Sequence, residues 1–256
     1  VVNYTPAQSV SVVNLDQNKF IEEIETPGCS VLYTGGNRDF YSICGNGGFM
    51  HIRLDEEGHL VSLNRTQKLF DPVDDFLTIS ASRVGNIWYF VSRQNNVYAI
   101  EMNDDQISLK GSWSLLSEDE RTDEWLISGM HHTAIHDASE QLFVIMHQGT
   151  PETFEEPGTE VWVYDLKTRQ KIREIEMEDM TISITVDQGS EPRLLALDAY
   201  VPMNILFTAW TYLTQGEAEI IKLLKQRVNI YDARNGDHIT ATEPLPNGFV
   251  YNIQTW

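Results

Sequence analysis

The chain has 256 residues and a formal net charge of -20 at pH 7, from 38 acidic and 18 basic residues. An acidic chain repels phosphate backbones and anionic lipid head groups, so we expect neither nucleic acid nor a membrane as its partner. No apolar run approaches the roughly 20 residues that a spanning helix needs, and ordinary glycine and proline contents predict a globular chain.

A unit of strand, acid, turn and strand recurs along the chain. Its acids lie 39, 46, 64 and 67 residues apart, at Asp16, Asp55, Glu101, Asp165 and Asp232. A four-stranded propeller blade takes roughly 40 to 50 residues, so the first two spacings fit and the last two require insertions. Short apolar runs and turn residues fill the intervals between the acids. The pattern predicts an all-β fold, a β-propeller with about five blades, the first of them incomplete.

The repeated acid has a structural explanation. A short acidic side chain at a β turn accepts hydrogen bonds from the backbone N–H groups that follow it. Carboxylates also line calcium sites and act as general acids and bases, but the turn role explains better why one acid recurs in every unit.

Two insertions account for the long spacings. Residues 147–160 are polar, contain two prolines and are predicted to form a surface loop. Residues 199–227 include GEAEIIKLLKQR, whose apolar residues recur at helical spacing and predict a short helix. We interpret residues 1–256 as one propeller domain. A propeller must close to protect its sheet edges, so either further blades precede Val1 or the terminal segment NGFVYNIQTW pairs with the start; we expect N-terminal blades before Val1.

The sequence contains no self-contained catalytic motif. Nucleophile elbows, HExxH, phosphate loops, dinucleotide fingerprints, EF-hand loops and CxxC pairs are all absent. The densest candidates for metal ligands are four histidines, but no cysteine or fixed acid spacing completes a site. We interpret them as structural: His131, His132, His136 and His147. No catalytic, cofactor-binding or metal-binding residue is therefore predicted in this chain.

The two cysteines flank a predicted strand, turn and strand. This arrangement can bring the Cα atoms of Cys29 and Cys44 within bridging distance. A disulfide and a pair of reduced, buried thiols are both compatible with it.

Several segments resemble those of one protein family and occur in the same order. The segment PGCSVLYTGGNRDFYSICGNGGFMHIRL resembles the part of methylamine and aromatic amine dehydrogenase heavy chains in which two cysteines flank a strand pair. LFDPVDDFLTISASRVGNIWYFVSRQNNVYAIEM is similar to the next blade, and LLSEDERTDEWLISG to an acidic, helix-like connection that leads into a tryptophan. The resemblance continues through TAIHDASEQLFVIMHQG, TEVWVYDLKTRQKIREIEM, ISITVDQGSEPRLLALDA and VNIYDARNGDHI. Residues 199–227 depart from it, because the family usually passes there by a short turn.

The resemblance implies a seven-bladed propeller with a disulfide between Cys29 and Cys44. It further implies the non-catalytic heavy (alpha) subunit of a periplasmic quinoprotein amine dehydrogenase, an oxidoreductase that converts primary amines to aldehyde and ammonia. In that family the cofactor, tryptophan tryptophylquinone, belongs to a light (beta) subunit. Two heavy and two light chains form an α2β2 heterotetramer, and electrons pass to a cupredoxin of the amicyanin or azurin type.

Two other functions are compatible with a propeller. A stand-alone scaffold that binds proteins or peptides would be isolated as a stable monomer. A propeller hydrolase of the lactonase type would need calcium ligands that converge on the central channel, whereas the repeated acids are predicted at turns. Loss of esterase or lactonase activity on calcium removal would favour that second function.

Overall fold

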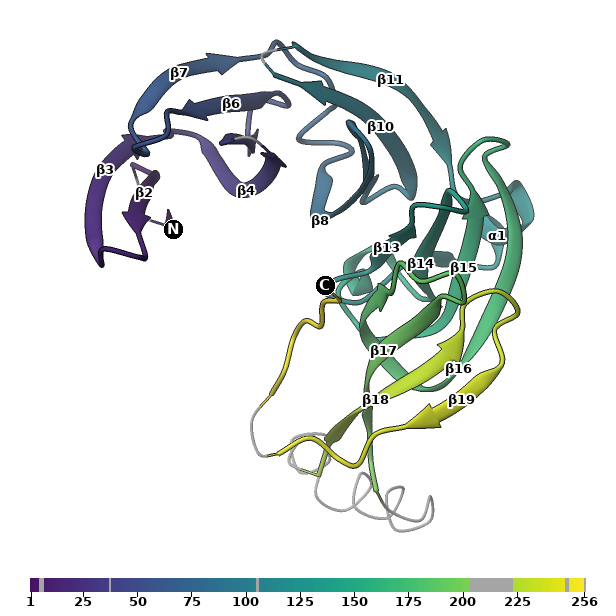
Figure 1. Cartoon of the computed structure of the whole chain (residues 1–256). Coiled ribbons are helices and arrows are strands. Elements are labelled where there is room, and N and C mark those ends of the chain that lie inside the picture. Colours follow the sequence, from purple (N-terminus) through teal and green to yellow (C-terminus); the bar gives the residue numbers. More distant parts are fainter. Residues whose placement is uncertain (5–6, 37, 105, 203–222, 247–248, 256) are drawn as a thin grey trace. The chain divides into compact units, whose positions relative to one another are not determined.

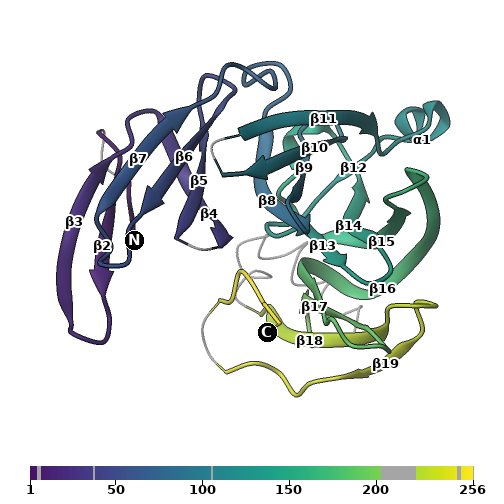
Figure 2. The same ribbon diagram turned by 45° about the horizontal axis from the view of Figure 1, so that its top comes forward.

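The computed structural model describes residues 1–4, 7–36, 38–104, 106–202, 223–246 and 249–255 (Figures 1 and 2). Most of these residues lie in antiparallel β-strands, as the sequence predicts. The chain divides into two compact units, Val1–Trp113 and Ser114–Trp256. In the described ranges, no helix has the length and apolar character that a membrane span requires.

The first unit contains three antiparallel sheets, and within each sheet neighbouring strands follow one another in the chain. The first sheet has three strands, and the second and third have four each. The strands are β1 (Val2–Asn3), β2 (Ser9–Asn14) and β3 (Lys19–Glu25), then β4 (Cys29–Gly36), β5 (Asp39–Cys44), β6 (Phe49–Leu54) and β7 (Leu60–Arg65), then β8 (Leu77–Val84), β9 (Ile87–Ser92), β10 (Asn96–Asn103) and β11 (Gln106–Ser114).

The β4–β7 sheet has apolar side chains on both faces. Met50 and Ile52 of β6 pack with both cysteines and with Val10 and Ile24 of the first sheet. On the other side, the aromatic residues of β4–β6 pack with those of the β8–β11 sheet in a second cluster, Tyr33, Tyr41, Phe49, Phe70, Leu77, Trp88, Phe90, Ile100 and Met102. Burial stabilises each large side chain by about 1.5 to 3 kcal/mol, so these clusters hold the three sheets together.

The second unit is one extended sheet. Its longest strand, β16, pairs through its first part with β15 and through its last part with β17, so it belongs to two successive four-stranded groups. The strands are β12 (Trp125–Ile127), β13 (Thr133–His136), β14 (Gln141–Gln148), β15 (Gly158–Asp165), β16 (Gln170–Val186), β17 (Arg193–Tyr200), β18 (Lys225–Asp232) and β19 (His238–Ala241). With the three sheets of the first unit, these two groups account for the predicted five blades.

One short helix, α1 (Glu118–Thr122), precedes β12. It begins at a capping box: Ser117 Oγ accepts a hydrogen bond from the Glu120 amide, and the Glu120 carboxylate accepts one from the Ser117 amide. The helix lies in the acidic segment for which the resemblance implied a helix-like connection, and Trp125 follows it.

Part of the second insertion differs from the prediction. Residues 225–227, placed at the end of the predicted helix, instead begin β18 and pair with residues 198–200 at the end of β17. The ladder to β17 gives these residues a strand conformation that local helix propensity does not override. Residues 203–222 of the insertion lie outside the described residues. In the first insertion, residues 149–157 form a loop with a short 3-10 helix at Pro151–Thr153, between β14 and β15.

The turn role is confirmed for three of the repeated acids. Asp55, Asp165 and Asp232 each accept a hydrogen bond from a backbone N–H that follows in the chain. The prediction is wrong for Glu101, which lies inside β10 opposite Ile87 and pairs with Lys110. In the first unit, Asn14 rather than the nearby Asp16 accepts the hydrogen bond of the turn.

Candidate functional site: the bridged strand pair and the buried polar networks

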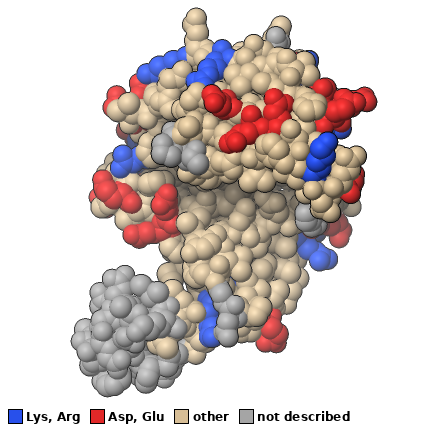
Figure 3. Space-filling model, turned by 90° about the vertical axis from the view of Figure 1, so that its left-hand side faces the viewer, with Lys and Arg blue, Asp and Glu red and all other residues tan. Residues whose placement is uncertain are grey.

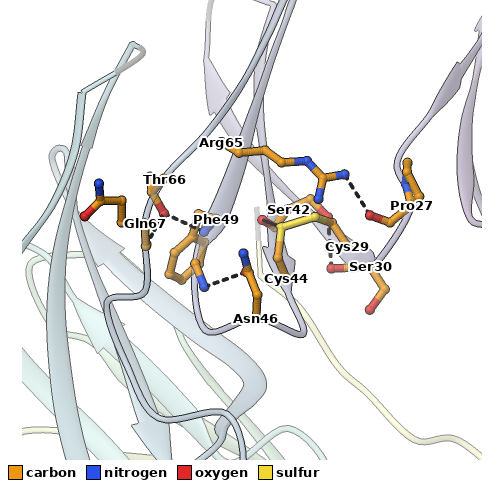
Figure 4. Close-up of a disulfide and its surroundings, with 11 residues drawn as sticks. Pro27, Cys29, Ser30, Ser42, Cys44, Asn46, Phe49, Arg65, Thr66 and Gln67 are labelled. Atoms are coloured by element: carbon orange, nitrogen blue, oxygen red, sulfur yellow. Dashed lines mark hydrogen bonds between the residues drawn. A yellow bond between two sulfur atoms is a disulfide. The ribbon is translucent and has the colours of Figure 1, made fainter.

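A disulfide joins the first residue of β4 to the last residue of β5 (Figure 4). Cys29 and Cys44 lie directly opposite each other in the antiparallel register, and both are almost fully buried. The pairing is the one that the family resemblance implied. The bridge ties together the first two strands of the β4–β7 sheet.

The turn that follows Cys44 fixes the position of the bridge. The Cys44 amide donates to the Gly48 carbonyl, and the Gly48 amide donates to Asn46 Oδ1. Gly47 has φ +85°, and a Cβ there would lie 2.3 Å from the Phe70 carbonyl oxygen. Only glycine satisfies both the backbone conformation and this close approach.

Two further hydrogen bonds hold the chain next to the bridge. Ser42 Oγ donates to the Ser30 carbonyl across the β4–β5 pair (Figure 4). Arg65 of β7 donates through Nη2 to the Pro27 carbonyl, 2.7 Å away, in the segment that leads into β4. Side-chain hydrogen bonds therefore fix both the β4–β5 pair and the segment that leads into β4.

β4 contains a strained bulge two residues after Cys29. The register shifts after Ser30, and Val31 has φ +61°, a conformation that β-branched residues rarely adopt. Neighbouring side chains here reach different cores, because successive residues of a strand point to opposite faces. Val31 packs against the aromatic cluster, and Leu32 packs against the cluster that contains the disulfide.

A buried ionic network lies at the other end of β5 and β6. Asp39 accepts hydrogen bonds from His51 Nε2 at 2.6 Å and Arg53 Nε at 2.9 Å. Arg53 also pairs with Asp104 in the turn between β10 and β11, and Tyr41 stacks on the His51 ring while donating to the Asp104 carbonyl. Although burial raises the pKa of Asp39, the hydrogen bonds from Arg53 and His51 hold it below its ordinary value. The network connects the second and third sheets of the first unit.

A second network joins four strands of the second unit, β16 to β19. Asn229 Nδ2 donates to Asp198 Oδ2 at 2.7 Å and to Asp179 Oδ2 at 3.0 Å. Arg227 Nε donates to Asp179 Oδ2, and His238 Nε2 lies 2.9 Å from Asn229 Oδ1. Burial raises the pKa of Asp198 to about 6, although hydrogen bonds from Asn229 and Thr181 lower it.

The four histidines occupy separate positions around β13 and β14. His136 contacts Ser139 and the Gly189 carbonyl, His147 contacts Thr153, and His132 contacts the Gly129 carbonyl. His131 precedes β13 and bridges to Ser183 through its backbone. Across the described part of the chain, no three His, Cys, Asp or Glu residues are grouped as metal ligands would be.

Neither network was predicted from the sequence. The signal that could have found the first is the pair of polar residues spaced two apart in each of two apolar strands, Asp39 with Tyr41 and His51 with Arg53. Alternation places each pair on one face, but only the β5–β6 register shows that Asp39 lies opposite Arg53. The first network braces two sheets against each other, and the second joins strands within one sheet.

Comparison with known proteins connects this structure to one family. Residues 1–223 match the family model described as methylamine dehydrogenase heavy chain. The methylamine dehydrogenase heavy chain of Methylobacillus flagellatus is 23% identical over 218 residues, which cover 84% of this chain and 54% of the relative. That of Paracoccus versutus is 23% identical over 251 residues, covering 96% of this chain and 52% of the relative. The chain thus spans about half the length of these curated relatives.

Solved structures show the same fold at low sequence identity. The WD40 domain of Neurospora crassa Pan2 superposes with a TM-score of 0.55 and 11% identity, covering 96% of this chain and 63% of that one. Hydrazine synthase of Kuenenia stuttgartiensis gives a TM-score of 0.51 at 9% identity, covering 86% and 49%. The Dos1 propeller gives 0.50 at 12% identity, covering 96% and 54%. These likenesses support the β-propeller fold. Because the family model matches most of its length, the chain belongs to the methylamine dehydrogenase heavy chain family.

Proposed function

We propose that this chain is part of the non-catalytic heavy subunit of a quinoprotein amine dehydrogenase. That enzyme oxidatively deaminates primary amines to aldehyde and ammonia and passes the electrons to a cupredoxin. The observation that carries the proposal is the match of residues 1–223 to the heavy chain family. Two curated relatives named methylamine dehydrogenase heavy chain align with 84% and 96% of the present chain.

The proposed role is to order and support a partner rather than to react. The quinone, tryptophan tryptophylquinone, belongs to the light subunit in this proposal, and two heavy and two light chains form the assembly. In support, two carboxylates of the buried networks are already engaged in contacts between strands. Asp39 is held by His51 and Arg53, and Asp179 by Arg227 and Asn229.

We place the assembly in the periplasm. The support is the buried disulfide between Cys29 and Cys44, because disulfides form and persist in oxidising compartments and are rare in the cytosol. The acidic character of the chain agrees with a partner that is neither nucleic acid nor an anionic membrane.

The partner can be identified by purifying the full-length protein from its native source under mild conditions. Mass spectrometry of the co-purifying chains should find a small, disulfide-dense subunit in equal amount, and the native mass should correspond to two copies of each chain. A preparation washed in high salt is the control for loosely bound contaminants. Recovery of a monomer with no such subunit would contradict the proposal and favour a stand-alone binding scaffold.

A further inference from the structure

Residues 177–180 of β16 form a wide bulge in the sheet of the second unit. Between two paired positions of the β15–β16 ladder, Gly158–Thr181 and Glu160–Glu176, one residue of β15 faces four residues of β16. A bulge lifts its extra residues out of the ladder and gives their side chains new directions. The bulge residues are therefore free to line a site beside the sheet.

An open pocket of about 390 Å³ lies at this bulge. Pockets that bind small organic molecules begin at roughly 300 Å³, so this one has room for such a molecule. Its lining consists of Thr159, the four bulge residues and residues 199–201 at the end of β17. Most of that lining is apolar or aromatic, from Met177, Met180, Ala199, Tyr200 and Val201, and its two acids are Glu178 and Asp179.

Contacts from β18 hold the bulge in place. The Glu178 amide donates to the hydroxyl of Tyr231, a buried residue, at 2.9 Å. Asp179 Oδ2 accepts from Arg227 Nε at 2.7 Å and from Asn229 Nδ2 at 3.0 Å. The pocket wall is therefore formed before a ligand arrives, which lowers the ordering cost of binding.

The pocket carries negative charge that no neighbour neutralises. Arg227 binds Asp179 at Oδ2, and its guanidinium lies over the Tyr200 ring, 4.7 Å from the ring centre. Among the described residues, neither Asp179 Oδ1 nor the Glu178 carboxylate has a hydrogen-bond or ion-pair partner. Two carboxylates against one guanidinium leave the pocket negative, so it favours a cation over an anion.

We propose that this pocket binds a small alkylammonium ion. The ammonium N–H groups donate to Asp179 Oδ1 and to the Glu178 carboxylate, and charge-assisted hydrogen bonds of this kind are stronger than neutral ones. The carbon chain packs on the methionine side chains, whose thioethers adapt to irregular apolar shapes. A hard metal ion prefers a shell of oxygen ligands, which this largely apolar lining does not supply. The proposal rests on the residues of this chain and does not depend on the proposed function.

Isothermal titration calorimetry of the full chain with butylammonium chloride tests the proposal. Sodium butyrate and 1-butanol, at the same ionic strength, replace the cation by an anion and by a neutral group. Butylammonium should bind saturably, butanol more weakly and butyrate not at all. Glu178→Gln should weaken butylammonium binding about three- to tenfold, the loss expected for one hydrogen bond to a charged group. The matched control is Glu176→Gln, because Glu176 is exposed on the same strand but does not line the pocket, and it should keep the wild-type affinity.

NMR of carbon-13-labelled methionine methyl groups locates the bound ion. The Met180 signal, assigned with Met180→Leu, should shift saturably with butylammonium, whereas the signal of Met50, buried in the first unit, should not move. The proposal would be overturned by any of four results: no saturable binding of butylammonium, an equal affinity for butanol, an unchanged affinity in Glu178→Gln, or binding that leaves the Met180 signal in place.

Discussion

At the scale of single residues, a buried histidine makes the stability of the second unit depend on pH. His132 is almost fully buried, and burial lowers its pKa to about 4. The unfolded chain therefore binds more protons than the folded chain between about pH 6.5 and pH 4, so stability falls as the pH falls through this window. The shift corresponds to roughly 3 kcal/mol.

We predict that His132→Asn reduces this pH dependence. The asparagine amide can replace the donor that Nδ1 offers to the Gly129 carbonyl, and it does not titrate. Urea unfolding from neutral pH to pH 4 should give a flatter profile for the variant, with a residual slope from His131 and His147, whose pKa values burial also lowers. If stability changed with pH in the same way for the wild-type protein and the variant, protonation of His132 would not destabilise the folded state, and the prediction would be wrong.

A second prediction concerns the charge buried between β5 and β6. Asp39→Asn removes the negative charge that His51 and Arg53 share, and it should cost about 2 to 4 kcal/mol in the free energy of unfolding. The matched control is Asp104→Asn, because Asp104 pairs with the same arginine but is largely exposed, and it should cost less than about 1 kcal/mol.

The pKa of Asp39 also predicts how the stability of the folded chain responds to acid. The pKa of Asp39 is lower in the folded state, so its contribution is complete above about pH 4 and is lost as the pH falls through its folded pKa. Asp39→Asn should lack this part of the acid transition. Equal losses for Asp39→Asn and Asp104→Asn at neutral pH would argue against a special role for the buried carboxylate.

At the scale of elements, the disulfide constrains the hairpin that opens the β4–β7 sheet. Cys29 and Cys44 are 15 residues apart, and a loop of that length restricts the unfolded chain enough to contribute about 3 kcal/mol. The double variant Cys29→Ala/Cys44→Ala should lose a comparable amount in urea unfolding. The reduced wild-type protein should unfold at a similar urea concentration. A loss below about 1 kcal/mol would show that the bulge and the turn hold the hairpin without the bridge.

The turn after the disulfide gives a sharper comparison between two glycines. Both Gly47 and Gly85 have positive φ, but a Cβ at Gly47 would lie 2.3 Å from the Phe70 carbonyl oxygen, whereas a Cβ at Gly85 meets nothing within 4 Å. Gly85→Ala should therefore cost only about 1 kcal/mol for the backbone conformation, and Gly47→Ala at least about 2 kcal/mol more. Chemical denaturation of both variants checks this, and equal losses would contradict the steric argument.

Elements were predictable from the sequence where one local rule governs them. Asp55, Asp165 and Asp232 follow the turn rule because each short side chain accepts a hydrogen bond from a backbone N–H of its own turn. Glu101 has a similar spacing in the sequence, but it lies inside a strand. Residues 225–227 resemble a helix locally, but the ladder to β17 decides their conformation. Long-range pairing is the information that spacing alone does not contain.

Polar interactions inside the sheets were less predictable for the same reason. The contacts among Asp179, Asp198 and Asn229 depend on the registers of two strand pairs, β16–β17 and β17–β18. The bulge at Val31 is likewise invisible in the sequence, because valine is an ordinary strand residue whose strained φ appears only in the folded chain.

At the scale of the whole molecule, the order of segments was the strongest signal. No single motif is specific, but the shared order of cysteines and blade segments indicated the family that the match over residues 1–223 identifies. The surface agrees with the composition. In the described part of the face in Figure 3, both acidic and basic side chains are visible.

The central claim is that this chain supports quinone chemistry that takes place in a partner. The most direct measurement is the visible absorption spectrum of the intact complex, recorded before and after addition of a primary amine under anaerobic conditions. The account predicts a quinone absorbance that the amine bleaches, that the corresponding alcohol leaves unchanged, and that stays with the small subunit when the chains are separated. A complex with no quinone absorbance, or an absorbance that remains with this chain after separation, would contradict it.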